Sequence, residues 1–387
     1  MNREDTETRS LSKAPPLPGP LLHQMEEREN ARRRNSGIVE TVAPQIIHTI
    51  LLPRGTEFML HRLTMKRTQD CGIIFLALLL AGSAAGADSK REVPSKIDLP
   101  PKIVSFIKGK EAHARELERK LELNMDKDCW TFLRLAGAGD WRAASRTFDR
   151  LEKRSGRMSG ETEPEIWNAG WQPMSEVKMI LDAFCPTSGS PEFATAVGEG
   201  IVRSIPRGSI YFGGTDVGRG LPTAFSKAHA DADPFFTLTQ NQFADGTYLK
   251  YLAATYGKKV YVPSEEDSQK CFTEYLTDAQ KRLDHDRKFH NEPRQLKPGE
   301  DVRIIDNKVQ VSGQVAVMAI NGLLAKIIFD KNPGKDFYVE ESFPLDWMYP
   351  HLTPHGLIFR LNRETLPTLS PEVVAKDREF WTKQTGK

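Results

Sequence analysis

A glycine-rich segment carries the first chemistry that the sequence suggests. Gly213, Gly214, Thr215 and Asp216 follow a short apolar run, and Arg219 lies three residues further on. Glycines let backbone N–H groups approach an anion closely, a following helix adds the positive end of its dipole, and an arginine can pair with the same anion. The spacing fits neither the P-loop nor the dinucleotide fingerprint. The segment therefore predicts either a ligand-binding loop or a tight turn whose glycines are purely structural.

A second polar cluster follows the next apolar run, residues 235–239. If the two runs are neighbouring parallel strands, their carboxyl ends share one edge of a sheet, where ligands gather in open α/β folds. The alternative is that Asp245 caps a helix beginning at Gly246 and that the amides satisfy loop backbone. The candidate ligand-binding residues of this cluster are Gln240, Asn241, Asp245 and Tyr248.

A third candidate is Glu341, at the start of an acidic and aromatic stretch. Carboxylates beside aromatic rings are typical of sugar sites, where the acids hold hydroxyl groups or a proton. One interpretation is a paired-carboxylate enzyme that uses Asp216 or Asp245 together with Glu341. The other is that the aromatic residues after Glu341 pack in the core.

Metal-ligand and thiol patterns are weak in this sequence. His351 and His355 are four residues apart, but each follows a proline, so one helix presenting both to a metal is not expected. Cys129, Cys185 and Cys271 form no metal-ligand spacing, and we expect them to be small buried residues. We therefore expect no metal site, and no cofactor is indicated.

The elements that would position these residues alternate between β-rich and helical runs from residue 206 onward, which is typical of a parallel α/β sheet. We predict an α/β domain over 205–366, with a mostly parallel, Rossmann-like sheet and flanking helices. The expected strands are 209–212, 235–239, 259–262, 337–340 and 357–361, with a hairpin over 302–311. The expected helices are 222–230, 246–256, 264–283 and 313–330.

A helical segment, residues 111–204, is expected before the sheet. Helix formers run over 111–135, glycines break the pattern, and a second helix over 141–153 completes a helical hairpin. Further helices are expected at 174–184 and 193–204. Prolines among charged residues indicate a linker over 88–110, and residues 367–387 are expected to be a tail ending in a short amphipathic helix.

Residues 65–87 have the pattern of a cleavable signal peptide. Met65 is followed by two basic residues, an apolar run and a stretch of small residues that ends before Asp88. The alternative is a membrane anchor, but the apolar run is about half of the ~20 residues needed to span a bilayer. Residues 1–64 are then either a mis-assigned extension or a disordered tail. We expect an exported protein, periplasmic or extracellular, with no membrane span after cleavage.

Composition excludes some classes of protein. The 387 residues are 39% hydrophobic, which suffices for one large core or two ordinary ones and excludes a wholly disordered chain. The 54 Lys and Arg residues nearly balance the 52 Asp and Glu residues, leaving a formal charge of +2. The chain has no overall basic excess, so its charge does not indicate a nucleic-acid partner.

Residues 200–365 resemble part of a known family. The segments SIYFGGTD (209–216), FDKN (329–332), FYV (337–339) and PHGLIFR (354–360), together with the polar cluster 240–248, follow one another in a similar order in that family. The family is the soluble C-terminal region of bacterial multi-pass membrane proteins described as protein O-mannosyltransferase-like. The resemblance implies an extracytoplasmic α/β domain connected with the cell envelope or with glycans. It does not imply glycosyl transfer, because the membrane-embedded part of that family has no counterpart here.

Three functional hypotheses follow. The first is a non-catalytic domain that binds a polar ligand, a glycan or an envelope protein at the strand ends. The second is a hydrolase or transferase acting on sugars or phosphoesters through Asp216 or Asp245 with Glu341. The third is a scaffold whose glycines are purely structural. The sequence leaves open whether the protein is an enzyme.

Overall fold

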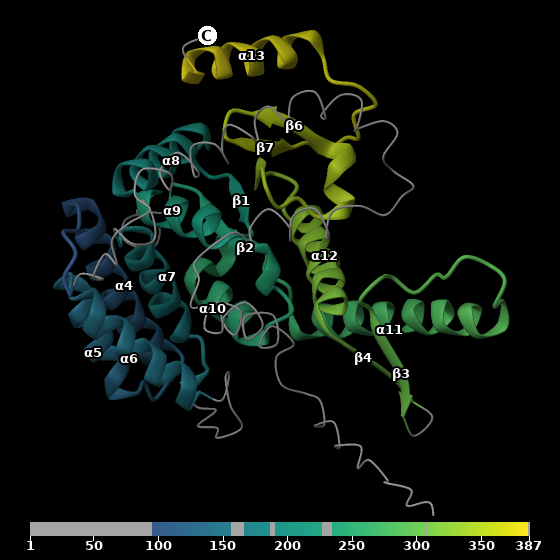
Figure 1. The fold of residues 1–387 in the computed structure, drawn as a ribbon, viewed down its shortest axis with the longest axis horizontal. Coiled ribbons are helices and arrows are strands. Elements are labelled where there is room, and N and C mark those ends of the chain that lie inside the picture. Colours follow the sequence, from purple (N-terminus) through teal and green to yellow (C-terminus); the bar gives the residue numbers. More distant parts are fainter. Residues whose placement is uncertain (1–94, 156–165, 186–189, 227–233, 306–307, 386–387) are drawn as a thin grey trace, which may run out of the picture.

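The computed structural model describes residues 95–155, 166–185, 190–226, 234–305 and 308–385 (Figure 1). The expected signal peptide 65–87 and the extension 1–64 lie outside the described residues. Helices come first along the described chain, and a five-stranded sheet with helices on both faces follows. The prediction of an α/β fold preceded by helices is confirmed.

The helices before the sheet are α4 (Pro101–Lys120), α5 (Lys127–Gly137), α6 (Trp141–Arg154), α7 (Trp171–Ala183) and α8 (Pro191–Ser204). The helix α4 begins inside the expected linker 88–110, because a proline at the first helical position is already in a helical conformation. A single helix over 111–135 is wrong. Glu122 has a left-handed backbone, φ 51°, and the Asp126 side chain accepts the N–H of Asp128 at 2.8 Å, which starts α5 as a new helix.

The sheet has the strand order β2 (Phe236–Thr239), β1 (Ile210–Gly213), β5 (Phe337–Glu340), β7 (Ile358–Leu361), β6 (Leu352–His355). β1 is parallel to both β2 and β5, whereas β7 is antiparallel to its two neighbours, β5 and β6. The sheet is therefore mixed, with a parallel part and an antiparallel hairpin. The strand β6 was not expected from the sequence because it contains Pro354, which a strand tolerates at a sheet edge.

The helix after β1 starts earlier than the sequence predicts. α9 (Asp216–Ser226) begins within the glycine-rich segment and contains Pro222. A proline inside a helix leaves the carbonyl four residues before it without an N–H donor. Here the Tyr211 hydroxyl donates to the Gly218 carbonyl at 2.8 Å, which replaces that missing bond.

An arm of the structure leaves the sheet after α10 (Gly246–Tyr256). It consists of α11 (Glu265–Lys288) and the antiparallel hairpin β3 (Asp301–Ile305) and β4 (Lys308–Ser312), which extend outward beside one another (Figure 1). The expected strand 259–262 is wrong. The backbone of Tyr261 is held by the side chain of Asn332, which accepts its N–H at 2.8 Å and donates to its carbonyl at 3.2 Å, so no strand partner is needed.

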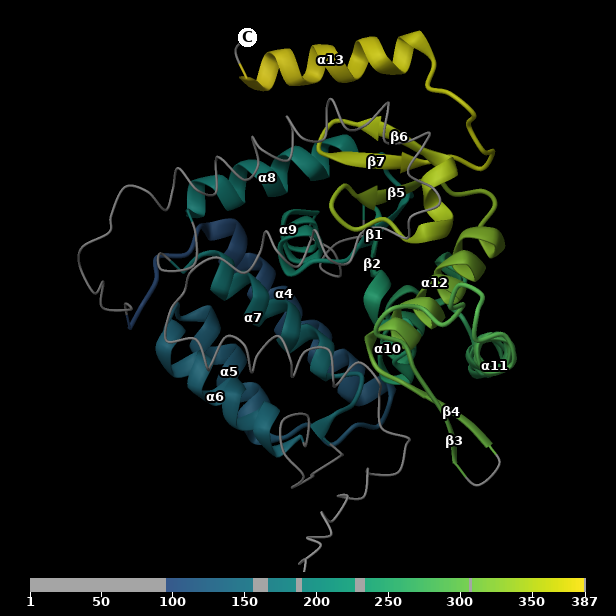
Figure 2. The same ribbon diagram turned by 45° about the vertical axis from the view of Figure 1, so that its right-hand side comes forward.

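The chain returns from the arm through α12 (Gln314–Lys331), which lies against the sheet, and finishes in α13 (Pro371–Thr385) beside β6 (Figures 1 and 2). The hairpin, α12 and a helix in the C-terminal tail are confirmed. Among the described helices, none is both long enough and apolar enough to cross a bilayer.

Alternate residues of β1 pack into two cores. Tyr211 faces the helical side and packs in one core with residues of α4, α7, α8 and α9, whereas Ile210 and Phe212 face α10 and α12. The N-terminal helices therefore share a core with the sheet. The three described cysteines are buried, as predicted.

Candidate functional site

The ends of β2, β1 and β5 bring three segments together at one edge of the sheet. Gly213 is paired with Thr239, and Phe212 with Val339, in parallel register. Because all three strands run the same way, the residues after each of them leave the sheet on the same side. We call the segments 213–219, 240–245 and 340–342 the strand-end rim. The sequence prediction that the first two segments share one edge is confirmed.

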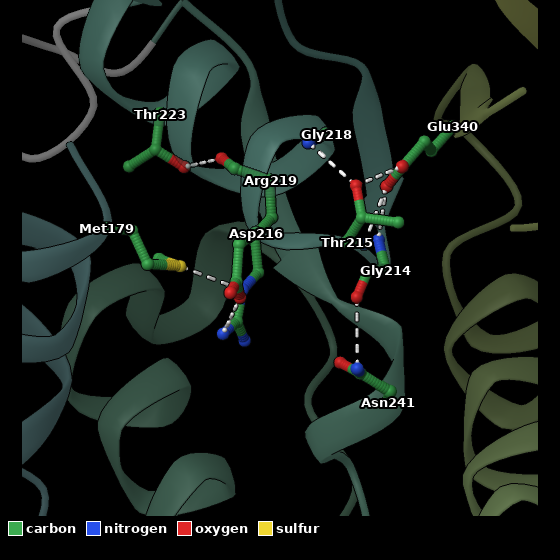
Figure 3. A network of polar contacts seen from close by, with 9 residues as sticks. All are labelled: Met179, Gly214, Thr215, Asp216, Gly218, Arg219, Thr223, Asn241 and Glu340. Atoms are coloured by element: carbon green, nitrogen blue, oxygen red, sulfur yellow. Dashed lines mark hydrogen bonds and ion pairs between the residues drawn. The ribbon is translucent and has the colours of Figure 1, made fainter. Parts of the chain in front are cut away.

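The carboxylate of Glu340 occupies the position where the sequence suggested a ligand anion (Figure 3). Its Oε2 accepts the N–H groups of Gly214 at 2.7 Å and Thr215 at 2.9 Å. Its Oε1 accepts the hydroxyl groups of Thr215 and Ser342, the latter at 2.8 Å. Glu340 is only 6% exposed. The backbone donors of the glycine-rich segment thus bind an anion that the protein itself supplies.

Two glycines make this contact possible. A Cβ atom at Gly218 would lie 1.9 Å from the Glu340 carboxyl carbon, and one at Gly214 would lie 2.2 Å from the Phe343 ring. The Gly218 N–H in turn donates to the Thr215 hydroxyl at 2.9 Å. The glycines therefore have a structural role, which is to let Glu340 and Phe343 approach the backbone.

Asp216 and Arg219 form an ion pair one turn apart on α9. The Arg219 guanidinium lies 2.9 Å from Asp216 Oδ1, and its Nε donates to the Met179 sulfur at 3.1 Å (Figure 3). The arginine side chain is 8% exposed and the aspartate side chain 53% exposed. The sequence suggested that Arg219 would meet an external anion, and in the structure Asp216 balances its charge.

The segment after β2 is joined to the glycine-rich segment. Asn241 Nδ2 donates to the Gly214 carbonyl at 3.0 Å, and Gln240 Nε2 donates to the Phe343 carbonyl. Asp245 Oδ1 accepts the N–H of Thr247 at 2.8 Å, so the predicted cap of α10 is confirmed. Together with the bond from Gly214 to Glu340, the Asn241 bond connects all three segments of the rim.

Tyr248 is placed differently from the other candidates. Its hydroxyl accepts the N–H of Thr239 at 2.6 Å, while the Tyr256 hydroxyl donates to the Thr237 carbonyl at 3.1 Å. Both tyrosines are on α10, and both satisfy the free edge of β2, which would otherwise be open to strand pairing. Burial raises the pKa of Tyr248 above its usual range, so the hydroxyl stays neutral and supports the edge.

Four buried side-chain oxygens at the rim have no hydrogen-bond donor within the described part of the chain. They all lie within the six residues that follow β2. An unpartnered buried acceptor costs about 1–3 kcal/mol, so several in one segment indicate a place where a bound donor would be stabilising. The atoms are Gln240 Oε1, Asn241 Oδ1, Gln242 Oε1 and Asp245 Oδ2.

Glu341, the carboxylate that the sequence favoured, is exposed and does not bind the glycine-rich segment. Even so, surrounding protein partly removes its carboxylate from water and the Glu340 charge repels it, and both effects raise its pKa. Side chains alternate between the two faces of a strand, and this alternation along β5 identifies Glu340 as the residue that faces the glycine-rich segment. Tyr338 and Glu340 share a face of β5, and that face is the one covered by α9.

The aromatic residues after Glu341 pack in the core rather than line a site. The Trp347 ring lies 5.4 Å from the Phe329 ring, and the His351 ring lies 5.9 Å from the same phenylalanine. His355 bonds the Ser204 carbonyl at 2.8 Å. Across the described residues, no group of His, Cys, Asp and Glu side chains is arranged to hold a metal ion.

Sequence reasoning missed a buried charged group beside the rim. Lys110 of α4, which is 0% exposed, pairs with Glu176 of α7, and Glu176 Oε1 accepts the Tyr251 hydroxyl of α10 at 2.9 Å. Burial and the Glu176 charge raise the pKa of Tyr251. The helical pattern of α4 does not reveal this ion pair, because Glu176 lies 66 positions after Lys110 in the sequence.

Two surface hollows lie away from the rim. One, of ≈ 950 Å³, follows the exposed face of α11, and the other, of ≈ 790 Å³, lies between α8 and α13. Neither includes a predicted site residue. Comparison with protein-family models, with curated proteins and with solved structures finds no match for this chain.

Proposed function

We propose that the α/β unit is a non-catalytic binding module that takes a polar ligand, such as a glycan or part of an envelope protein, at the strand-end rim. The observation that carries this proposal is the group of unpartnered buried oxygens after β2, in a segment fixed by the bond from Asn241 to Gly214. A segment that is already rigid loses little conformational entropy when a ligand binds to its unsatisfied acceptors. The parallel part of the sheet is, in this proposal, a Rossmann-like framework for that rim.

A thermal-shift series tests the rim. We expect the full chain to be stabilised by a sugar or polyol from a panel, by about 2.7 kcal/mol at a hundred times the dissociation constant. Asn241→Ala should abolish the shift, because it removes both the bond to the Gly214 carbonyl and one unpartnered acceptor. Asn124→Ala, at an exposed asparagine between α4 and α5, is the matched control and should retain it. A shift that both variants retain would contradict the proposal.

One observation favours catalysis as a second candidate. Glu341 is exposed and has a raised pKa, which is what a general acid requires. The partners that the sequence offered are engaged elsewhere, since Asp216 pairs with Arg219 and Asp245 caps α10. Hydrolysis of a sugar or phosphoester substrate by the purified chain, lost in Glu341→Gln, would favour this candidate over the binding module.

We also propose that the protein is exported to the bacterial envelope or beyond, on the strength of the signal pattern 65–87. Expression in a bacterial host should yield a mature chain whose first residue is Asp88, as read by N-terminal sequencing. Leu78→Arg, which interrupts the apolar run, should leave the precursor uncleaved in the cytoplasm. An uncleaved wild-type chain would contradict export by this route.

A further inference from the structure

The outer side of the helices α5 and α6 is strongly basic. Seven residues of these two helices are exposed, and all seven carry a charged side chain. One is acidic, Asp149, and we call the surface formed by the other six the basic face. Its residues are Lys127, Arg134, Arg142, Arg146, Arg150 and Lys153. The whole chain has a formal charge of +2, so the net positive charge of this face exceeds that of the protein.

Helical periodicity aligns the basic residues of α6 in one row. Arg142, Arg146 and Arg150 recur every four residues, and Lys153 falls on the same side of the helix. The opposite side of α6 packs in the core through Leu151, which is 0% exposed. At a rise of about 1.5 Å per residue, the row is about 16 Å long. A row of this length can contact several anionic groups at once.

The helix α5 lies beside this row and adds the other two basic residues. Arg154 of α6 lies 2.6 Å from Asp126, which caps α5, and both views show the two helices side by side (Figures 1 and 2). Two helices in contact present a broad surface rather than a single ridge. Neither of the two surface hollows described above includes a residue of α5 or α6. The face therefore suits an extended anionic surface better than a small anion in a pocket.

Most of the positive charge on the face is not balanced by the protein. Four of the six cations have no carboxylate within ion-pair distance in the described part of the chain, namely Lys127, Arg134, Arg146 and Lys153. Arg150 lies 3.6 Å from Asp128, but its side chain is still 57% exposed. An exposed ion pair of this kind contributes little. Anions from outside are therefore attracted to the face.

The chemistry of the face also favours one kind of anionic partner. Interfaces between proteins usually have an apolar centre, and single-stranded nucleic acids stack on exposed aromatic rings. The exposed residues of α5 and α6 include neither an apolar nor an aromatic side chain. A layer of lipid phosphates needs neither, because arginine and lysine bind it through charge and hydrogen bonds at its surface.

We infer that the basic face docks the protein on an anionic phospholipid surface. The contact is peripheral and electrostatic, with the guanidinium and ammonium groups of α5 and α6 against the lipid phosphates. It concerns a surface other than the strand-end rim, so it does not depend on the ligand proposed there.

Co-sedimentation of the full chain with lipid vesicles tests the inference. Vesicles of phosphatidylglycerol and phosphatidylcholine are compared with vesicles of phosphatidylcholine alone. The chain should bind the anionic vesicles at least about tenfold more tightly, because each basic residue near such a surface contributes about fivefold. The preference should disappear at about 1 M salt, where the Debye length is about 3 Å.

Two double variants locate the binding surface. Arg146→Gln with Lys153→Gln removes two charges from α6, and Lys127→Gln with Arg134→Gln removes two from α5. Each pair should weaken binding to the anionic vesicles about 25-fold, from about fivefold for each residue. All four positions are exposed, so the thermal unfolding curve should stay unchanged. The segment 65–87 is the same in every variant, so its own affinity for lipid cancels in the comparison.

The matched control removes the same net charge elsewhere. Lys270→Gln with Lys281→Gln, at exposed lysines of α11, should change binding by less than about twofold, because distant exposed charges are screened. Equal binding to neutral and anionic vesicles, or an equal loss in the control and in the α5 and α6 variants, would overturn the inference. Tighter binding to heparin or single-stranded DNA than to anionic vesicles, at equal concentrations of anionic groups, would overturn it in favour of a soluble polyanion.

Discussion

Replacing Glu340 with alanine is expected to lower the free energy of unfolding by about 4 kcal/mol, because hydrogen bonds to a charged group contribute about 1.5–3 kcal/mol each and the effects are not additive. The change removes the acceptor of two N–H groups and two hydroxyl groups from a position that is 6% exposed. Denaturant unfolding monitored by circular dichroism measures the difference.

The neighbouring residue supplies the control for that experiment. Glu341→Ala removes an identical side chain from an exposed position, so the free energy of unfolding should change by no more than about 0.5 kcal/mol. Equal losses in the two variants would show that the contacts of Glu340 with the glycine-rich segment do not stabilise the fold. A loss only in Glu340→Ala would show that the segment is held by the protein's own carboxylate.

Glu176→Gln is expected to cost about 3–5 kcal/mol, the range for breaking a buried ion pair by removing one partner. Lys110 is 0% exposed, so loss of the carboxylate charge leaves its ammonium group in the core. Lys110→Met should cost less, because Glu176 is 15% exposed and keeps the hydrogen bond from Tyr251. Urea unfolding of both variants gives the two values.

A double-mutant cycle completes the test of this pair. Lys110→Met combined with Glu176→Gln should cost less than the sum of the two single changes, since no buried charge is left without a partner. Additive losses would mean that the two side chains do not interact. Because Lys110 is on α4 and Glu176 on α7, the coupling measures how firmly these two N-terminal helices hold each other, and the bond from Tyr251 to Glu176 links the pair to α10.

The rim could be located from the sequence, but its internal bonding could not. Strand and turn patterns placed the glycine-rich segment and the cluster after 239 at the ends of two strands, and Asp245 as a helix cap. Those predictions depend on local alternation and capping chemistry. Which of Glu340 and Glu341 reaches Gly214 depends on a contact 126 positions away in the sequence, and the local pattern of the sequence does not reveal it.

The sequence by itself determined the α/β class, the helices before the sheet and the hairpin over 302–311. It also determined the capped helix α10 and the helix α11. All of these follow from periodicity and from residues close together in the chain. Tertiary structure alone decided that α9 continues through Pro222, since the replacement donor is the Tyr211 hydroxyl on β1. It also decided that Asn332 holds Tyr261 in place of a strand, and that the anion position of the glycine-rich segment is filled by Glu340. The physical reason is the same in each case: a buried polar group takes the nearest partner in space, and distance along the chain does not reveal which partner that is.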